Sequence, residues 1–246
     1  MTALTALTER MVRISLRDFD LALGVFAPAV TLVGVNLALR HVIDTGELSY
    51  ADYVLPGIIV QAMLLGAVTT ADRAAAEQAS GFAIRLRIQP MSALTPMTAR
   101  LIYCLMRGTL ALVATIGTAL LIGVHLPAQF ADVIAFLLIP LVLAVALSLA
   151  GDAVGTAIAR LGAGQLLLVP QLILILVSTA LAPAESFPEW VQPFVRHQPV
   201  SQIVDTLRDL AHDTVGAADL AAAVGWCIGL LLAFGAIATH LQGRRR

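Results

Sequence analysis

The hydrophobic and polar positions of this chain fall into long blocks. Six blocks of about 20 residues contain no Asp, Glu, Lys or Arg, and they cover residues 21–39, 53–71, 108–124, 133–151, 166–182 and 220–239. A helix needs about 20 apolar residues to cross the hydrocarbon core of a bilayer. A membrane-spanning β-barrel would instead alternate polar and apolar residues in strands of about 10. The pattern therefore predicts an all-α integral membrane protein with six transmembrane helices in a single domain over residues 1–246.

Composition supports this class. Hydrophobic residues make up 59% of the chain and charged residues only 13%, and the mean hydropathy is +0.90. A soluble domain has roughly a quarter of its residues charged. A soluble fold is therefore excluded.

The basic residues predict the orientation of the spans. All fifteen are arginine, and twelve of them fall in segments that share one side of the membrane with the N-terminus. The remaining three are Arg40, Arg196 and Arg208. Because arginine-rich short loops stay in the cytoplasm, both termini and the loop after the second span are predicted to be cytoplasmic.

The first twenty residues predict an amphipathic helix that lies in the membrane interface. Leu4, Leu7, Met11 and Ile14 recur at helical spacing, and arginines line a neighbouring face. Two alternatives are a charged tail that only sets topology and a cleaved signal peptide. The apolar run of 21–39 is longer than a usual signal core, and no small-x-small cleavage site follows it.

Two connecting segments are too long and too patterned to be simple loops. Residues 71–100 contain a good helix former, then Gly81 as a C-cap, then the short amphipathic stretch "FAIRLRIQ" that Pro90 ends. Residues 183–218 contain the aromatic and proline-rich "FPEWVQPF", followed by an amphipathic helix with Pro199 near its start and Ser201 as N-cap. The second segment is predicted to lie in or dip into the outer leaflet.

The sequence carries few groups for chemistry. It has no lysine and no GxxxxGK[ST] motif, so it lacks a phosphate-loop nucleotide site, and HExxH, GxSxG and paired metal-binding cysteines are missing too. Inside the spans only mildly polar residues remain, and Asn36, Gln61 and Gln171 are candidates to line a substrate path. Arg107, Asp132 and Asp152 lie at span borders, where we expect them to reach water and anchor the helices.

The whole chain resembles the membrane subunits of ABC-2 type exporters, particularly the daunorubicin-resistance branch of actinobacteria. The cytoplasmic loop matches the family pattern at Glu77, Gly81, Arg85, Leu86, Pro90 and Ser92, and Arg100 resembles the basic residue that opens the third span. The outer segment matches at Phe187, Pro188, Trp190, Pro193, Phe194, Pro199 and Arg208. One departure is Gln78, because the family often has Glu-Arg-Glu before the glycine.

The resemblance implies roles for both segments. The cytoplasmic loop would contain the coupling helix that docks on a separate ATP-binding subunit, with the coupling residues Glu77, Gly81, Phe82, Arg85, Leu86, Arg87 and Pro90. The outer segment would form a gate, with Phe187, Pro188, Trp190, Pro193, Phe194 and Pro199. This chain would hold no cofactor and would not be an enzyme, since ATP and Mg²⁺ bind on the partner. Its partners would be an ATPase dimer, a second permease subunit and the lipid membrane, with no nucleic acid.

The resemblance thus predicts a permease subunit in the plasma membrane of an actinobacterium. It would move an amphiphilic or lipid-like substrate, a drug or a complex lipid, outward by ATP hydrolysis in another subunit. The alternatives are an importer, a permease for a polysaccharide or another polymer, a non-transporting membrane anchor or channel, and an intramembrane enzyme.

Overall fold

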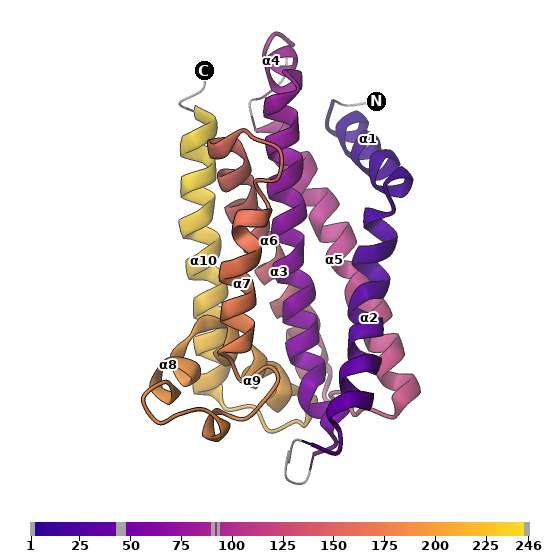
Figure 1. Cartoon of the computed structure of the whole chain (residues 1–246), viewed down its shortest axis with the longest axis vertical. Coiled ribbons are helices and arrows are strands. Elements are labelled where there is room, and N and C mark those ends of the chain that lie inside the picture. The colour runs from indigo at the N-terminus through magenta and orange to yellow at the C-terminus, as the bar shows by residue number, and fades with distance from the viewer. Residues whose placement is uncertain (1–2, 43–47, 90–91, 93, 244–246) are drawn as a thin grey trace.

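The computed structural model describes residues 3–42, 48–89, 92 and 94–243. Its regular elements are all helical in these ranges (Figure 1). They are α1 (Ala3–Arg17), α2 (Asp20–Leu39), α3 (Tyr50–Ala79), α4 (Phe82–Arg87), α5 (Thr95–Ile122), α6 (Phe130–Ile158), α7 (Gln165–Leu176), the 3-10 turn η1 (Ala184–Ser186), α8 (Gln192–His197), α9 (Pro199–Ala211) and α10 (Ala217–Gly243). The predicted all-α class is confirmed.

Within the described ranges, five helices are long and apolar enough to cross a membrane, namely α2, α3, α5, α6 and α10. They contain almost all of five of the predicted blocks, and four of them continue well past the apolar run. The block 166–182 differs from its prediction, because α7 ends at Leu176 after 12 residues. At 1.5 Å per residue this helix is about 18 Å long, shorter than the bilayer core of about 30 Å. The backbone leaves helical geometry at Val177. The apolar block 166–182 therefore extends beyond the end of the helix.

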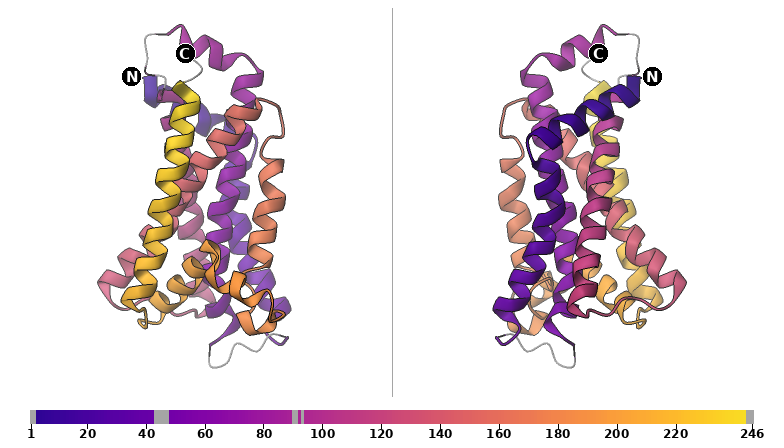
Figure 2. Two further views of the ribbon diagram at one scale, coloured as in Figure 1. Left: turned by 90° about the vertical axis from the view of Figure 1, so that its left-hand side faces the viewer. Right: turned by 90° about the vertical axis from the view of Figure 1, so that its right-hand side faces the viewer.

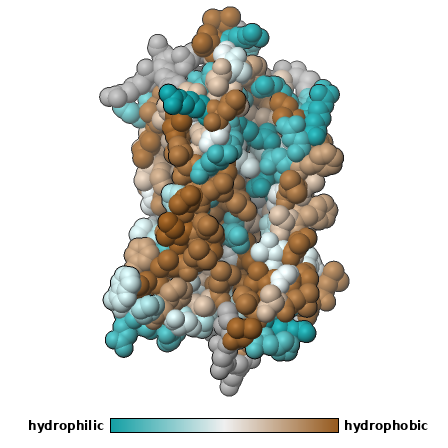
Figure 3. Space-filling view, in the orientation of Figure 1, coloured by the Kyte–Doolittle hydropathy of each residue, from teal (hydrophilic) through white to brown (hydrophobic). Residues whose placement is uncertain are grey.

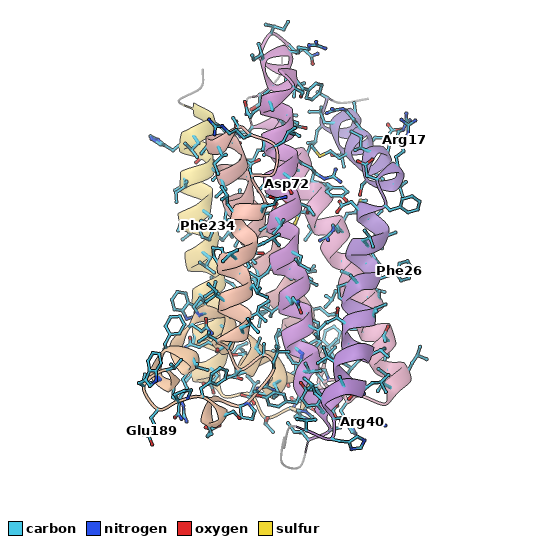
Figure 4. All side chains as sticks on the ribbon, in the orientation of Figure 1. Arg17, Phe26, Arg40, Asp72, Glu189 and Phe234 are labelled. Atoms are coloured by element: carbon cyan, nitrogen blue, oxygen red, sulfur yellow. The ribbon has the colours of Figure 1, made fainter. Side chains whose placement is uncertain are left out.

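Helix α3 occupies the centre of the bundle. Of its most apolar window 78% is buried, against 44% for α6 and 11% for α10. Neighbouring helices surround α3 on several sides (Figures 1 and 2). The outer helices expose large apolar side chains, as Phe26 on α2 shows by pointing away from the bundle in Figure 4. Such a surface suits contact with lipid.

Helices α3 and α6 approach each other through small residues. Gly151 and Gly155 on α6 face Ala67 and Ala71 on α3, and a Cβ atom at either glycine would overlap the opposing alanine carbonyl oxygen. Small residues at this spacing let two membrane helices approach closely. The central pair is therefore held by backbone proximity rather than by large side chains.

The two ends of the bundle carry different structures. Both termini and α4 lie at one end, and α8 and α9 lie at the other (Figures 1 and 2). The predicted amphipathic helix near Pro199 is present as α9, and its residues Ile203, Val204, Leu207 and Leu210 are at most 1% exposed. The predicted N-cap is wrong: α9 begins one residue after Gln198, so Ser201 lies inside the helix, where its hydroxyl accepts from the Thr179 N–H.

Helix α1 forms where the amphipathic pattern places it. It buries Leu7 and Met11 against Leu86 of α4 and Tyr103 of α5. Phe19, with φ of 57°, separates α1 from α2, and α1 runs at an angle to the bundle (Figure 1). Its position in a membrane interface stays a prediction.

Candidate functional site

A buried group of charges joins four helices at the end of the bundle that holds the termini. Arg100 on α5 donates from Nε to Asp152 Oδ1 of α6 at 2.6 Å, and its Nη1 group pairs with Glu77 of α3. Gln242 of α10 donates to the second oxygen of Asp152 at 3.2 Å. We call Arg100, Glu77 and Asp152 the Arg100 cluster. The residues are 4%, 9% and 0% exposed, so each depends on its partners for charge compensation.

A second polar group lies close by, where α1, α2, α3 and α5 meet. Arg73 Nη2 is 2.9 Å from Asp20 Oδ2, and the Tyr103 hydroxyl donates to the same carboxylate oxygen at 3.0 Å. Ser15 shares a hydrogen bond with the Tyr103 hydroxyl, and the Arg73 guanidinium lies 4.1 Å from the Tyr103 ring centroid. These contacts fix α1 and the start of α2 on the central helices.

The expectation that Arg107 and Asp152 reach water is wrong. Asp152 is fully buried by its contacts with Arg100 and Gln242, and Arg107 is only 6% exposed. The guanidinium of Arg107 fills the space beside Gly24 of α2, and its Nε has no hydrogen-bond partner. Both residues lie close to the end of an apolar block, which is why the sequence predicted contact with water. Distance along the chain does not show whether a side chain on the helix points to solvent or to a neighbouring helix.

The predicted coupling residues lie in different environments. Gly81 adopts φ of 70°, directly follows Ser80, which is the C-cap of α3, and is itself the N-cap of α4. The predicted C-cap is therefore one residue off. Phe82 lies under the Arg10 guanidinium at 3.8 Å, and Leu86 is buried against α1. Arg85 is exposed, whereas Glu77 is buried in the Arg100 cluster. The side chain of Arg87 and all of Pro90 lie outside the described residues.

The predicted outer-gate residues form a mainly exposed rim. Trp190 and Phe194 are 84% and 54% exposed. The prolines Pro188 and Pro193 are exposed too, while Phe187 and Pro199 are half-buried. Phe187 also provides a carbonyl oxygen to Gln192 at 2.9 Å. An exposed aromatic rim fits the headgroup region of a bilayer.

The three candidate path residues are not brought together by hydrogen bonds in the described part of the chain. Asn36 and Gln61 are half-buried. Gln171 on α7 is 9% exposed, and its Oε1 is buried without a partner. Among these three described residues, Gln171 is therefore the one with a fully buried acceptor that lacks a partner.

Sequence reasoning missed the polar contacts that hold the interrupted end of α7. Arg208 of α9 donates to the carbonyls of Tyr53 at 3.2 Å and Thr179 at 2.9 Å, and it pairs with Asp205 at 2.7 Å. Gln198 donates to the carbonyls of Leu174 and Val177. At the other end of α7, Asp72 of α3 accepts from the Gly164 N–H at 2.8 Å, beside the loop that precedes α7 (Figure 4). The carbonyls freed where α7 stops thus find donors within the protein, as burial in a membrane requires.

Replacing Arg208 with methionine is expected to lower the free energy of unfolding by about 3 kcal/mol, because buried carbonyls and the Asp205 carboxylate lose their partner. Burial already raises the pKa of Asp205, and Arg208 opposes that rise. Thermal unfolding in detergent measures the loss. The matched control is Arg196→Met, whose exposed pair with Glu185 contributes little. Equal melting temperatures for the two variants would contradict the assignment.

Comparison with known proteins identifies the family of this chain. The family model described as "ABC-2 family transporter protein" matches residues 29–240. The doxorubicin resistance ABC transporter permease protein DrrB of Mycobacterium tuberculosis is 32% identical, over 78% of this chain and 69% of its own length. The probable doxorubicin resistance permease DrrC of the same species is 25% identical over 83% and 75%.

A third relative comes from another actinobacterium. The daunorubicin resistance ABC transporter permease protein DrrB1 of Streptomyces coeruleorubidus is 26% identical, over 78% of this chain and 68% of its own length. The family match covers most of the chain, including α3 to α9 and nearly all of α10. The chain is therefore a multi-pass membrane protein that belongs to the ABC-2 transporter family.

Proposed function

We propose that this chain is the permease subunit of an ATP-driven exporter for amphiphilic, drug-like molecules. The observation that carries the proposal is its membership of the ABC-2 family. The geometry supports mechanical coupling between α4 and the membrane helices. Helix α4 lies beyond the spans at the end of α3, and the Arg100 cluster connects that end of α3 to α5 and α6. ATP and Mg²⁺ would bind to a separate ATPase subunit.

Helix α4 has a face suited to that partner. Leu86 anchors it on α1, while Ile84 is 65% exposed and Arg85 is exposed. Ile88, directly after α4, is 84% exposed. Apolar side chains flanked by an arginine are typical anchors in a protein interface. Closure of the ATPases would push α4, and α3 and α5 would pass the movement to α6 through the Arg100 cluster.

The topology completes the proposal. The end with the termini and α4 would be cytoplasmic, and the end with α8 and α9 would face outward. The chain would cross six times, with α7 and the residues after Leu176 together forming the fifth crossing beside α9. A second permease subunit would complete the transport path. The drug names of the relatives, doxorubicin and daunorubicin, support an amphiphilic cargo.

The export experiment uses the chain co-expressed with a candidate ABC-type ATPase of the same organism and reconstituted in proteoliposomes. ATP-dependent movement of daunorubicin is measured by fluorescence, with non-hydrolysable ATP as the control. A small hydrophilic solute of equal charge is the matched probe. Movement of the hydrophilic solute and not of daunorubicin would contradict an amphiphilic cargo.

The double variant Ile84→Ala, Arg85→Ala is expected to weaken binding of the ATPase about tenfold, because it removes two exposed side chains from the docking face of α4. Co-purification and drug-stimulated ATP hydrolysis measure the effect. Arg17→Ala is the control, since Arg17 is exposed at the end of α1 and lies away from α4 (Figure 4). Unchanged co-purification of the double variant would remove α4 as the docking element. These two positions are better probes than Glu77, whose loss would also disrupt the Arg100 cluster.

A further inference from the structure

A cavity of about 390 Å³ opens between α1, α3 and the loop before α7. Its walls include Arg10, Met11 and Ile14 from α1, Arg73 and Glu77 from α3, and Leu161 from the loop. Two of these residues also make contacts described above, since Arg10 lies over Phe82 of α4 and Glu77 belongs to the Arg100 cluster. The outer-gate residues are not among its walls. It is large enough for a small charged group and the start of an apolar tail.

The two arginines of the cavity retain donors for a ligand. Arg10 has one long ionic contact, because its Nη1 lies 3.6 Å from Glu77, whose other oxygen already pairs with Arg100. Its guanidinium also lies over the Phe82 ring at 3.8 Å, a contact that uses no N–H donor in the ring plane. The side chain of Arg10 is 41% exposed. Arg73 uses Nη2 for Asp20 and Nη1 for a long bond of 3.3 Å to the Met11 carbonyl. A guanidinium has five N–H donors, so both arginines can bind a further acceptor.

The surrounding charges favour an anion. The charged residues on the cavity wall are two arginines, Arg10 and Arg73, and one carboxylate, Glu77. Glu77 is shared between Arg10 and Arg100, so it does not fully neutralise Arg10. Asp20 and Asp72 lie close by, where Asp20 pairs with Arg73 and Asp72 accepts from the Gly164 N–H. The wall itself therefore carries one more positive than negative charge.

The rim of the cavity is apolar and accessible. Leu161 is 79% exposed and Ile14 is 38% exposed. On the face shown in Figure 3, hydrophilic side chains gather over the gap between α1 and the upper part of α3, above a broad hydrophobic surface. A ligand that satisfies both features has an anionic head and a hydrocarbon tail. A free inorganic anion would leave the apolar rim uncovered.

We propose that this cavity binds the phosphodiester headgroup of an anionic phospholipid, with Arg10 and Arg73 on the phosphate and the first part of an acyl chain against Ile14 and Leu161. Guanidinium groups match phosphate oxygens in geometry as well as in charge. The lipid would fasten α1 to α3 directly beside the Arg100 cluster. Under the topology proposed above it comes from the cytoplasmic leaflet. Binding does not require the chain to export anything.

Native mass spectrometry of the purified chain tests the site, after detergent solubilisation and titration with single lipids. The probes are phosphatidylglycerol, a diacylglycerol with the same acyl chains, and water-soluble glycerophosphoglycerol. Arg10→Gln should weaken phosphatidylglycerol binding about tenfold, because one charged donor pair is lost, and Arg10→Gln with Arg73→Gln should abolish it. Arg13→Gln is the matched control: Arg13 lies one turn away on α1, is exposed and pairs with Glu9.

Three results would overturn the proposal. Equal weakening by Arg10→Gln and Arg13→Gln would mean that arginines of α1 attract lipids without a defined site. Equal binding of diacylglycerol would mean that the phosphate is not recognised. Full competition by glycerophosphoglycerol would identify a free-phosphodiester site in place of a lipid site. Circular dichroism and thermal unfolding of each variant show that the fold is retained, and because no ATPase is present the outcome is independent of the export experiment.

Discussion

Replacing Arg100 with glutamine should lower the free energy of unfolding by about 3–5 kcal/mol, the usual cost of removing one partner from a buried ion pair. The Arg100 side chain is 5% exposed, and its guanidinium compensates the charges of both Glu77 of α3 and Asp152 of α6. Glutamine is shorter and neutral, so Asp152 would remain buried without a counter-charge and Glu77 would keep only its 3.6 Å contact with Arg10. Thermal unfolding in detergent should show a fall of roughly 10 °C in melting temperature.

Two further variants separate charge from packing. Adding Asp152→Asn to Arg100→Gln should recover part of the loss, because it removes one unpaired carboxylate. Arg107→Met should cost little or even stabilise, since the buried Nε of Arg107 has no hydrogen-bond partner to lose. If Arg100→Gln and Arg107→Met melted at the same temperature, the Arg100 cluster would have no special part in joining the helices.

Adding side-chain volume to Gly155 is expected to separate α6 from α3. A Cβ atom there would overlap the Ala71 carbonyl oxygen and lie 2.9 Å from the Ala74 Cβ. Gly155→Ala adds one methyl group, and overpacking of this kind lowers the free energy of unfolding by about 1–3 kcal/mol. Gly155→Val adds more volume and should prevent formation of a stable bundle. Size-exclusion chromatography of the expressed protein and its melting temperature measure the effect.

Gly117 provides the matched control. It lies on α5, and apart from its chain neighbours and the nearby backbone of its own helix, no described atom comes within 4 Å of the point that an alanine Cβ would occupy, so Gly117→Ala meets open space. It should leave the melting temperature unchanged or raise it, because alanine favours helix more than glycine does. If Gly155→Ala and Gly117→Ala behaved alike, close approach of α3 and α6 would not be what holds the centre of the bundle.

The sequence predicted correctly those features that depend on residues close together in the chain. The 3.6-residue period of Ile203, Val204, Leu207 and Leu210 predicts a one-sided helix, and α9 buries that side. Gly81 is predicted to end a helix, and it adopts the left-handed backbone that glycine tolerates best. Ser201 shows the limit of such local prediction. Serine is a favourable N-cap residue, but the helix begins two residues before Ser201.

The sequence did not predict ion pairs and hydrogen bonds between residues far apart in the chain. Arg100 and Asp152 are 52 positions apart, and Arg208 binds the carbonyl of Tyr53 from 155 positions away. No spacing rule links such residues, because the packing of helices brings them together. The same reason explains the wrong prediction for Arg107 and Asp152: a charge near the end of an apolar block can face either lipid headgroups or a neighbouring helix.

The sequence by itself determined the all-α membrane class, five of the long helices, the two patterned connecting segments and the absence of a phosphate loop, because these follow from hydrophobicity and local propensity. The tertiary structure decided where α7 ends, which charges are buried together and where a cavity remains between α1 and α3. These properties depend on which faces of distant helices meet. A backbone carbonyl or charged side chain that becomes buried between helices is stabilised only by a partner within the protein.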